Sequence, residues 1–118
     1  FVMFRLAEMY LIKAEALNEL NRGPEALIEL NRVRARAFEP DQPLVIAGQA
    51  NIRQAIFQER LFELAAEAKR RRDMIRAGTY TAARASTGKA AQPIYKILFP
   101  IPQTQLQSNP LLEQNPGY

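Results

Sequence analysis

Apolar and polar positions recur most regularly at helical spacing between Asn51 and Gly78, and this pattern predicts a long helix. The stretch has no proline, no glycine before its last residue, and many strong helix formers. Placed at about 100° per residue, one face carries Phe57, Leu61, Leu64, Ala65, Ala68 and Ile75. A second stripe carries Glu59, Glu63 and Glu67 beside Ile52, Ile56 and Met74. Asn51 is a candidate N-cap. A kink or a break is predicted near residues 68–70, because a straight helix would place Arg72 on the apolar face.

The glutamate stripe poses an electrostatic problem. Like charges at i,i+4 spacing repel by a few tenths of a kcal/mol, and a buried charge without a partner is very costly. Cations from elsewhere in the chain should therefore approach these carboxylates. We predict that Arg5, Arg34 or Arg36 lies within salt-bridge distance of Glu59, Glu63 or Glu67.

The first third of the chain, residues 3–37, predicts a helical hairpin. Residues 3–22 are apolar on two sides, which predicts packing from two sides; the second side carries Met9, Ile12, Ala16 and Leu20. Gly23 and Pro24 should end this helix and begin the next, over 24–37. The inward positions of that second helix are Ala26, Leu27, Leu30, Val33 and Ala37. The spacing matches a tetratricopeptide repeat, but no second copy follows at a 34-residue offset, so a single hairpin in a larger fold is preferred over a docking solenoid.

The remaining segments are less regular. Residues 38–50 form a loop in which Leu44–Ile46 tuck inward. Residues 79–118 are a loop and an extended, proline-rich tail, with at most one helical turn around 103–107. Tyr95, Ile97 and Leu98 form a short strand or merely an extended segment, and the apolar tail should wrap back over the helices. Together these elements predict one all-α domain over residues 1–118.

Composition narrows the chemistry. The 118 residues include no cysteine and no histidine, which excludes thiol and imidazole catalysis and His/Cys zinc sites. No catalytic, metal-binding or cofactor site is predicted, and the paired carboxylates are interpreted as structural, not as a glycosidase pair. The net charge of +4 raises nucleic acid as a partner. The run Lys69–Arg72, however, has helical ion-pair spacing to Glu67 and Asp73, which is preferred over a phosphate-binding patch.

Four ordered motifs then resemble the RagB/SusD family. The first is Arg5-x-Ala7-Glu8-Met9-Tyr10-Leu11-Ile12-x-Ala14-Glu15-Ala16, and the second is Leu30-Asn31-x2-Arg34-x-Arg36-Ala37. The third is Glu59-Arg60-x2-Glu63-Leu64-x2-Glu67-x2-Arg70-x2-Asp73-x2-Arg76-x-Gly78. The last runs from Phe99-Pro100-Ile101-Pro102 to Asn109-Pro110-x-Leu112-x-Gln114-Asn115-Pro116-Gly117-Tyr118. The chain departs from the family at Ala68, where glycine is usual, at Arg71 and Arg72, where aromatics are usual, and at Gln105, where glutamate is usual.

The resemblance implies a tetratricopeptide-like helical scaffold and a non-enzymatic role. It implies the C-terminal part of a longer, lipid-anchored outer-membrane protein of Bacteroidetes. Such a protein binds glycans or other nutrients and works with a SusC-like TonB-dependent transporter. Ligand-contacting residues do not carry over, and Tyr80 and Tyr95 are better interpreted as packing residues. The alternatives are a tetratricopeptide-type adaptor and a basic helical nucleic-acid binder.

The four motifs and the glutamate stripe define one set of candidate residues, a structural ion-pair network. Its predicted members are Arg5, Glu8, Glu15, Arg34, Arg36, Glu59, Arg60, Glu63, Glu67, Arg70, Asp73 and Arg76.

Overall fold

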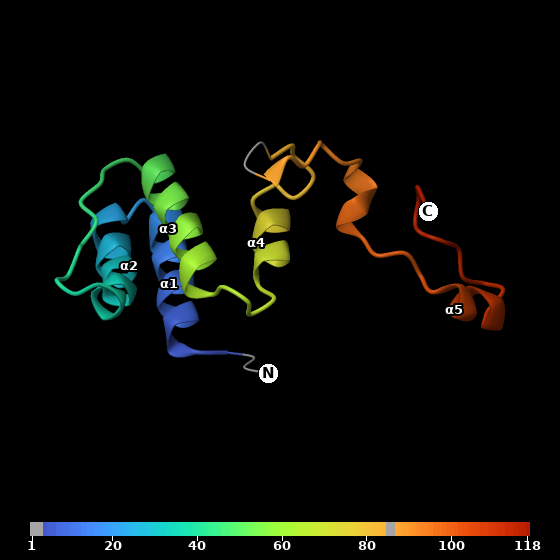
Figure 1. The fold of residues 1–118 in the computed structure, drawn as a ribbon, viewed down its shortest axis with the longest axis horizontal. Helices are drawn as coiled ribbons and strands as arrows, with labels where there is room; N and C mark the ends of the chain where they lie inside the picture. The colour runs from blue at the N-terminus through green and yellow to red at the C-terminus, as the bar shows by residue number, and fades with distance from the viewer. Residues whose placement is uncertain (1–3, 85–86) are drawn as a thin grey trace. The chain divides into compact units, whose positions relative to one another are not determined.

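The computed structural model describes residues 4–84 and 87–118, and over these residues it is helical (Figure 1). Its elements are α1 (Leu6–Glu19), α2 (Gly23–Ala37), α3 (Gln49–Glu63), α4 (Arg70–Arg76), the 3-10 helix η2 (Ile94–Ile97) and α5 (Gln103–Ser108). The β pairing seen among these residues is an isolated bridge between Arg84 and Lys89. The all-α prediction is confirmed. The chain divides into two compact units, Phe1–Arg70 and Arg71–Tyr118, which are described separately below; the single domain stays a prediction.

In the first unit, α1 runs antiparallel to both α2 and α3 (Figure 1). Two contacts fix the direction of α3 against α1. Asn18, near the end of α1, donates to the Gln49 carbonyl at the start of α3 over 3.0 Å. Arg5, just before α1, contacts Glu63 at the end of α3. The loop over residues 38–48 carries the chain back along α2, so α2 and α3 run in the same direction and their C-terminal ends lie together.

The three helices enclose one apolar core. Its buried members are Leu11, Ala14, Leu17, Ala26, Leu30, Val33, Ile52 and Ile56. Ala14 and Ala26 are fully buried, and their small side chains allow α1 and α2 to approach closely. Leu44 and Ile46 of the loop pack against this core, as predicted, but Val45, predicted to tuck inward with them, is 92% exposed. The buried face of α3 is therefore the stripe that contains Ile52 and Ile56, and Phe57 and Leu61, predicted on the main apolar face, are only half-buried.

The prediction that α1 is packed from two sides is wrong for the described chain. Met9, Ile12 and Leu20 are all exposed, Leu20 with 68% of its surface accessible. The reason is geometric: α2 and α3 both pack on the side of α1 that carries Leu11, Ala14 and Leu17.

The predicted glycine stop between α1 and α2 is also wrong. Asn21 adopts the left-handed conformation, with φ of 60°, while Gly23 is the first residue of α2. The Arg22 amide bonds to the Leu17 carbonyl and the Asn21 amide to the Asn18 carbonyl, which is the Schellman pattern, with asparagine in the usual glycine position. Gly23 instead lies beside α3, and a Cβ at this position would lie 2.9 Å from Cδ1 of Ile52.

Two separate helices replace the predicted helix over 51–78. α3 ends at Glu63 and α4 begins at Arg70, so the interruption that was predicted near residues 68–70 is present as a break and begins a few residues earlier. Ala66 and Ala68 in the connecting segment have positive φ, 62° and 57°, which no helix tolerates. Asn51 is not the N-cap either: α3 begins at Gln49 after Gly48, and the Asn51 side chain donates to the Ala47 carbonyl over 2.9 Å.

In the second unit, the C-terminal tail folds back on residues 98–101. Gln114 bonds to both backbone groups of Ile101, at 2.8 and 3.0 Å, and the Tyr118 hydroxyl donates to the Leu98 carbonyl over 2.9 Å. The prediction of a short strand or an extended segment at Tyr95, Ile97 and Leu98 is wrong for the first two residues, since they lie in η2; Leu98, just after η2, has extended backbone angles. The predicted turn near 103–107 is confirmed as α5. Phe99 and Leu111 remain 70% and 90% exposed. The expectation that the tail wraps back over the helices stays a prediction.

Candidate functional site

In the first unit, two arginines form ion pairs with Glu63. The Arg5 Nη1 lies 2.5 Å from Glu63 Oε1, and the Arg36 Nη2 lies 2.7 Å from each carboxylate oxygen. Arg5 also donates to the Glu63 backbone carbonyl and, through Nε, to Glu67 over 2.7 Å. The guanidiniums come from the start of α1 and the end of α2, so these contacts bind two other segments to the end of α3.

Glu59, one turn earlier on α3, holds a guanidinium from α2. Arg34 Nη1 lies 2.9 Å from Glu59 Oε2, and both side chains are largely buried. Arg34 Nε donates to the Gln42 carbonyl over 3.1 Å, and its guanidinium lies 4.6 Å from the Phe38 ring centroid. The ion pair thus also fixes the loop that follows α2.

Glu8 lies at the centre of the most buried group of charges. Only 1% of the residue is exposed, against 3% for Arg60 and 8% for Lys69. Lys69 Nζ lies 3.0 Å from Glu8 Oε2, and Arg60 Nη2 lies 3.7 Å from Oε1. The acid comes from α1, the guanidinium from α3 and the ammonium from the segment after α3. Since charges so buried are stable only with close partners, the cluster fixes these three elements in one arrangement.

The shifted pKa values in this region have identifiable causes. Desolvation works to lower the pKa of the Arg5 guanidinium, but the hydrogen bonds and charges of Glu63 and Glu67 together outweigh it and raise that pKa. At the other end of α1, the hydrogen bonds from Arg53 lower the pKa of the Glu19 carboxyl. Both shifts favour the charged forms, as expected of structural ion pairs and not of groups that exchange protons.

The other predicted members have different surroundings. The Arg70 guanidinium lies 4.2 Å from the Phe57 ring centroid. Asp73 is buried and pairs with Arg76, three residues later, at 3.3 Å. Glu15 is half-buried on α1 and contributes to raising the pKa of Arg53.

Sequence reasoning missed several ion pairs. Glu29 is 5% exposed and is approached by Lys13 at 2.7 Å and by Arg32 at 3.1 Å. The Arg32 contact has i,i+3 helical spacing and could have been found from the sequence. The Lys69–Glu8 pair joins residues far apart in the chain, and no local pattern signals it.

The basic run after α3 is engaged within the chain. Lys69 holds Glu8, and its ammonium lies 5.3 Å from the Phe4 ring. In the second unit, Arg71 donates to the Ile97 carbonyl over 2.7 Å, and its guanidinium lies 4.1 Å from the Phe99 ring centroid and 5.0 Å from that of Tyr80. Tyr95 packs edge-on against Tyr118, with centroids 5.0 Å apart. Tyr80 and Tyr95 thus have packing partners, as their interpretation from sequence requires.

Over residues 4–84 and 87–118, no three acidic side chains come together in a way that could hold a metal ion. No helix in the same ranges is long and apolar enough to cross a membrane. The helices and the ion pairs described above form a helical scaffold in which many charges are paired internally.

Comparison with known proteins places this scaffold in a family. The model of the SusD family matches residues 1–118. The chain is 39% identical to SusD-like protein P25 of Formosa agariphila, aligned over 99% of this chain and 24% of that protein. It is 31% identical to the starch-binding protein SusD of Bacteroides thetaiotaomicron, over 98% of this chain and 21% of that protein. A solved SusD superfamily protein from Parabacteroides distasonis superposes with a TM-score of 0.82 at 26% identity, over all of this chain and 27% of that one.

The chain belongs to the SusD family. It spans about a quarter of the length of the relatives that it matches. The family resemblance predicted from the four motifs is thereby confirmed.

Proposed function

We propose that this chain is the C-terminal scaffold of a glycan- or nutrient-binding protein of the outer bacterial surface. In this proposal a lipid anchor holds the whole protein at the membrane, and the protein acts with a SusC-like TonB-dependent transporter. Membership of the SusD family is the observation that carries the proposal. The name of one relative, the starch-binding protein SusD, supports a glycan as the ligand.

The ion pairs support a scaffold role for this part of the protein. The acids that the sequence singles out on α1 and α3, Glu8, Glu59 and Glu63, each hold a cation from another segment. A glycosidase needs two carboxylates free to face a substrate across a cleft, and acids held in this way favour a non-enzymatic role. The engagement of Lys69 and Arg71 likewise favours a scaffold over a nucleic-acid binder, because phosphate binding needs accessible cations.

The test uses the complete gene product in its native host. Surface exposure is measured by protease treatment of whole cells, glycan binding by an array with the purified protein, and the transporter by co-purification on an affinity tag. The proposal expects a surface-exposed protein that retains at least one glycan and co-purifies with a TonB-dependent transporter. A protein that stays protected in intact cells and retains no array glycan would contradict it.

Two control variants and one variant of the buried cluster test the scaffold role separately. Gln54→Ala and Gln58→Ala remove exposed side chains from α3 and should leave glycan binding unchanged. Glu8→Gln should lower the melting temperature of the complete protein and reduce binding only where the protein unfolds. Loss of glycan affinity in a fully folded Glu8→Gln protein would refute a purely structural role for this cluster.

A further inference from the structure

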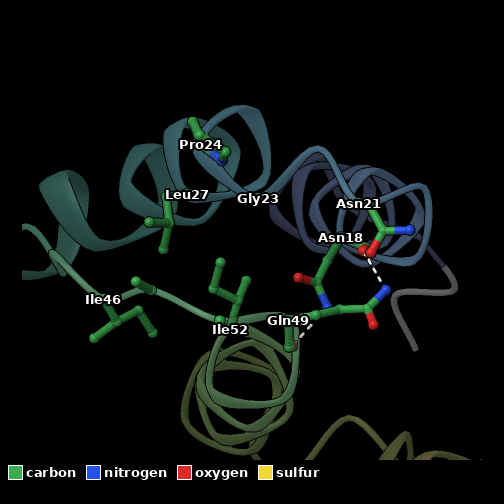
Figure 2. Close-up of a pocket in the computed structure, with 10 residues that line it drawn as sticks. Asn18, Asn21, Gly23, Pro24, Leu27, Ile46, Gln49 and Ile52 are labelled. Atoms are coloured by element: carbon green, nitrogen blue, oxygen red, sulfur yellow. Dashed lines mark hydrogen bonds between the residues drawn. The ribbon is translucent and has the colours of Figure 1, made fainter.

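A cavity of about 350 Å³ lies in the first unit where α1 ends, α2 begins and α3 begins. Figure 2 shows it with α2 on one side, the loop before α3 on another and the end of α1 on a third. Its lining includes Asn18, Pro24, Leu27, Ile46, Gln49 and Ile52. No lining residue is charged, and most of the wall is apolar. A volume in this range is that of a small-molecule site.

Asn18 supplies an acceptor in this wall that has no partner. The residue is only 1% exposed, and its Oδ1 is buried without a hydrogen bond among the described residues. A buried acceptor left unpaired is destabilising, and most such atoms in proteins are satisfied. The contrast with Asn31 is direct, because both ends of the Asn31 amide bond to the Leu44 backbone, at 3.0 and 2.8 Å.

The orientation of the Asn18 amide is fixed by its neighbour. Nδ2 donates to the Gln49 carbonyl over 3.0 Å, and Gln49 Nε2 donates in return to the Asn18 carbonyl over 2.8 Å. Turning the Asn18 amide over would place its oxygen against the Gln49 carbonyl oxygen. Oδ1 therefore points away from that carbonyl, toward the space beside Leu27 and Ile52, as Figure 2 shows.

We propose that this cavity binds a compact, neutral alcohol, whose hydroxyl donates to Asn18 Oδ1 while its hydrocarbon body contacts Leu27, Ile46 and Ile52. The uncharged lining selects a neutral ligand, and the buried acceptor without a hydrogen bond selects a donor. Water fits less well, since an ordered water needs two to four polar partners and the surrounding wall is apolar. This inference is independent of the proposed function.

The test compares two ring compounds of the same size, cyclohexanol and cyclohexanone, on the ¹⁵N-labelled 118-residue chain by NMR. Only the alcohol can donate a hydrogen bond. Cyclohexanol should cause saturable shifts of the amide signals of Asn18, Leu27, Gln49 and Ile52. Cyclohexanone should bind about five-fold more weakly, the factor that corresponds to one ordinary hydrogen bond.

Three variants locate the site and the acceptor. Leu27→Trp fills the cavity and keeps Asn18, so it should abolish the cyclohexanol shifts. Asn18→Leu removes the acceptor and should equalise the two affinities. Asn31→Leu, the matched control, should keep the preference for the alcohol. If a variant fails to fold, the comparison of the two compounds on the unaltered chain still decides the proposal.

Several results would overturn it. One is the absence of saturable shifts with cyclohexanol, including the case in which a bound water alone is detected beside Asn18. Others are equal affinities of the unaltered chain for the alcohol and the ketone, or shifts that map away from this cavity.

Discussion

Replacing Glu8 by glutamine tests whether the buried charges hold the helices together. Glutamine keeps the size of the side chain and removes its charge. The cations Arg60 and Lys69, which are 3% and 8% exposed, would then lose the negative charge of Glu8 that lies beside them. Because removing one partner from a buried ion pair costs about 3–5 kcal/mol, and small domains are stable by about 5–15 kcal/mol in total, the expected loss is a large part of the stability.

Urea unfolding followed by far-UV circular dichroism measures this loss. With a slope of about 2 kcal/mol per molar urea, a loss of about 3–5 kcal/mol lowers the midpoint by about 1.5–2.5 M. The matched control is Glu25→Gln, since Glu25 pairs with Arg22 at an exposed site. Exposed pairs contribute little, so the control should leave the midpoint close to that of the unaltered chain.

The double variant Glu8→Gln with Lys69→Met separates charge imbalance from lost packing. Removing both partners restores the charge balance of the cluster, and replacement of a whole buried pair is often nearly neutral. The double variant should therefore be more stable than Glu8→Gln alone, which a double-mutant cycle shows as a favourable coupling between the two sites. If Glu8→Gln unfolds at the same urea concentration as Glu25→Gln, the buried charges do not stabilise the fold and the reasoning is refuted.

Three further predictions concern single sites. Ala68→Gly should raise the free energy of unfolding by about 0.5–1 kcal/mol, because φ at Ala68 is 57° and glycine adopts this conformation without strain. The control Ala65→Gly changes a residue that does not have positive φ, and it should show no gain in the same urea experiment. Leu30→Ala should lower the thermal unfolding free energy by about 2–5 kcal/mol, since Leu30 is fully buried in the core. The Glu19 carboxyl, whose pKa is lowered by Arg53, should contribute stability above its unfolded pKa and lose it as the pH falls through the lower folded value. In an NMR titration Arg53→Gln should return that pKa toward its ordinary value, and an unchanged pKa would contradict the assignment.

The first two helices could be predicted from the sequence because the spacing of their apolar residues is a local pattern. Apolar residues at helical spacing predicted the inward positions Ala26, Leu30 and Val33 of the second helix, and the structure buries all three. The same reasoning identified the need for cations at the glutamate stripe, since Ile52 and Ile56 share that side of the helix. Arginines before α1 and late in α2 supply them, at Glu63 and Glu59.

The end of α3 could be predicted only approximately: an interruption was predicted near residues 68–70, whereas the helix ends at Glu63, where long-range contacts meet its last turn. Residues 64–68 are Leu-Ala-Ala-Glu-Ala, a sequence with high helix propensity. Arg5 nevertheless donates to the Glu63 backbone carbonyl, one of the groups that lack a helical partner at a helix end. A residue near the start of the chain thus satisfies the end of α3, and no window of local sequence contains that information.

The same contacts explain how two alanines can adopt a conformation that favours glycine. A left-handed alanine costs about 1–2 kcal/mol, and the connecting segment contains two, Ala66 and Ala68. Ion pairs hold the segment on either side of Ala68, since Glu67 binds Arg5 and Lys69 binds Glu8. The family resemblance implies a glycine at position 68, which matches the positive φ found there. The residues between α3 and α4 have a high helix propensity, but the buried charges hold their backbone in another path. The ion-pair network, more than the local sequence, therefore determines this part of the scaffold.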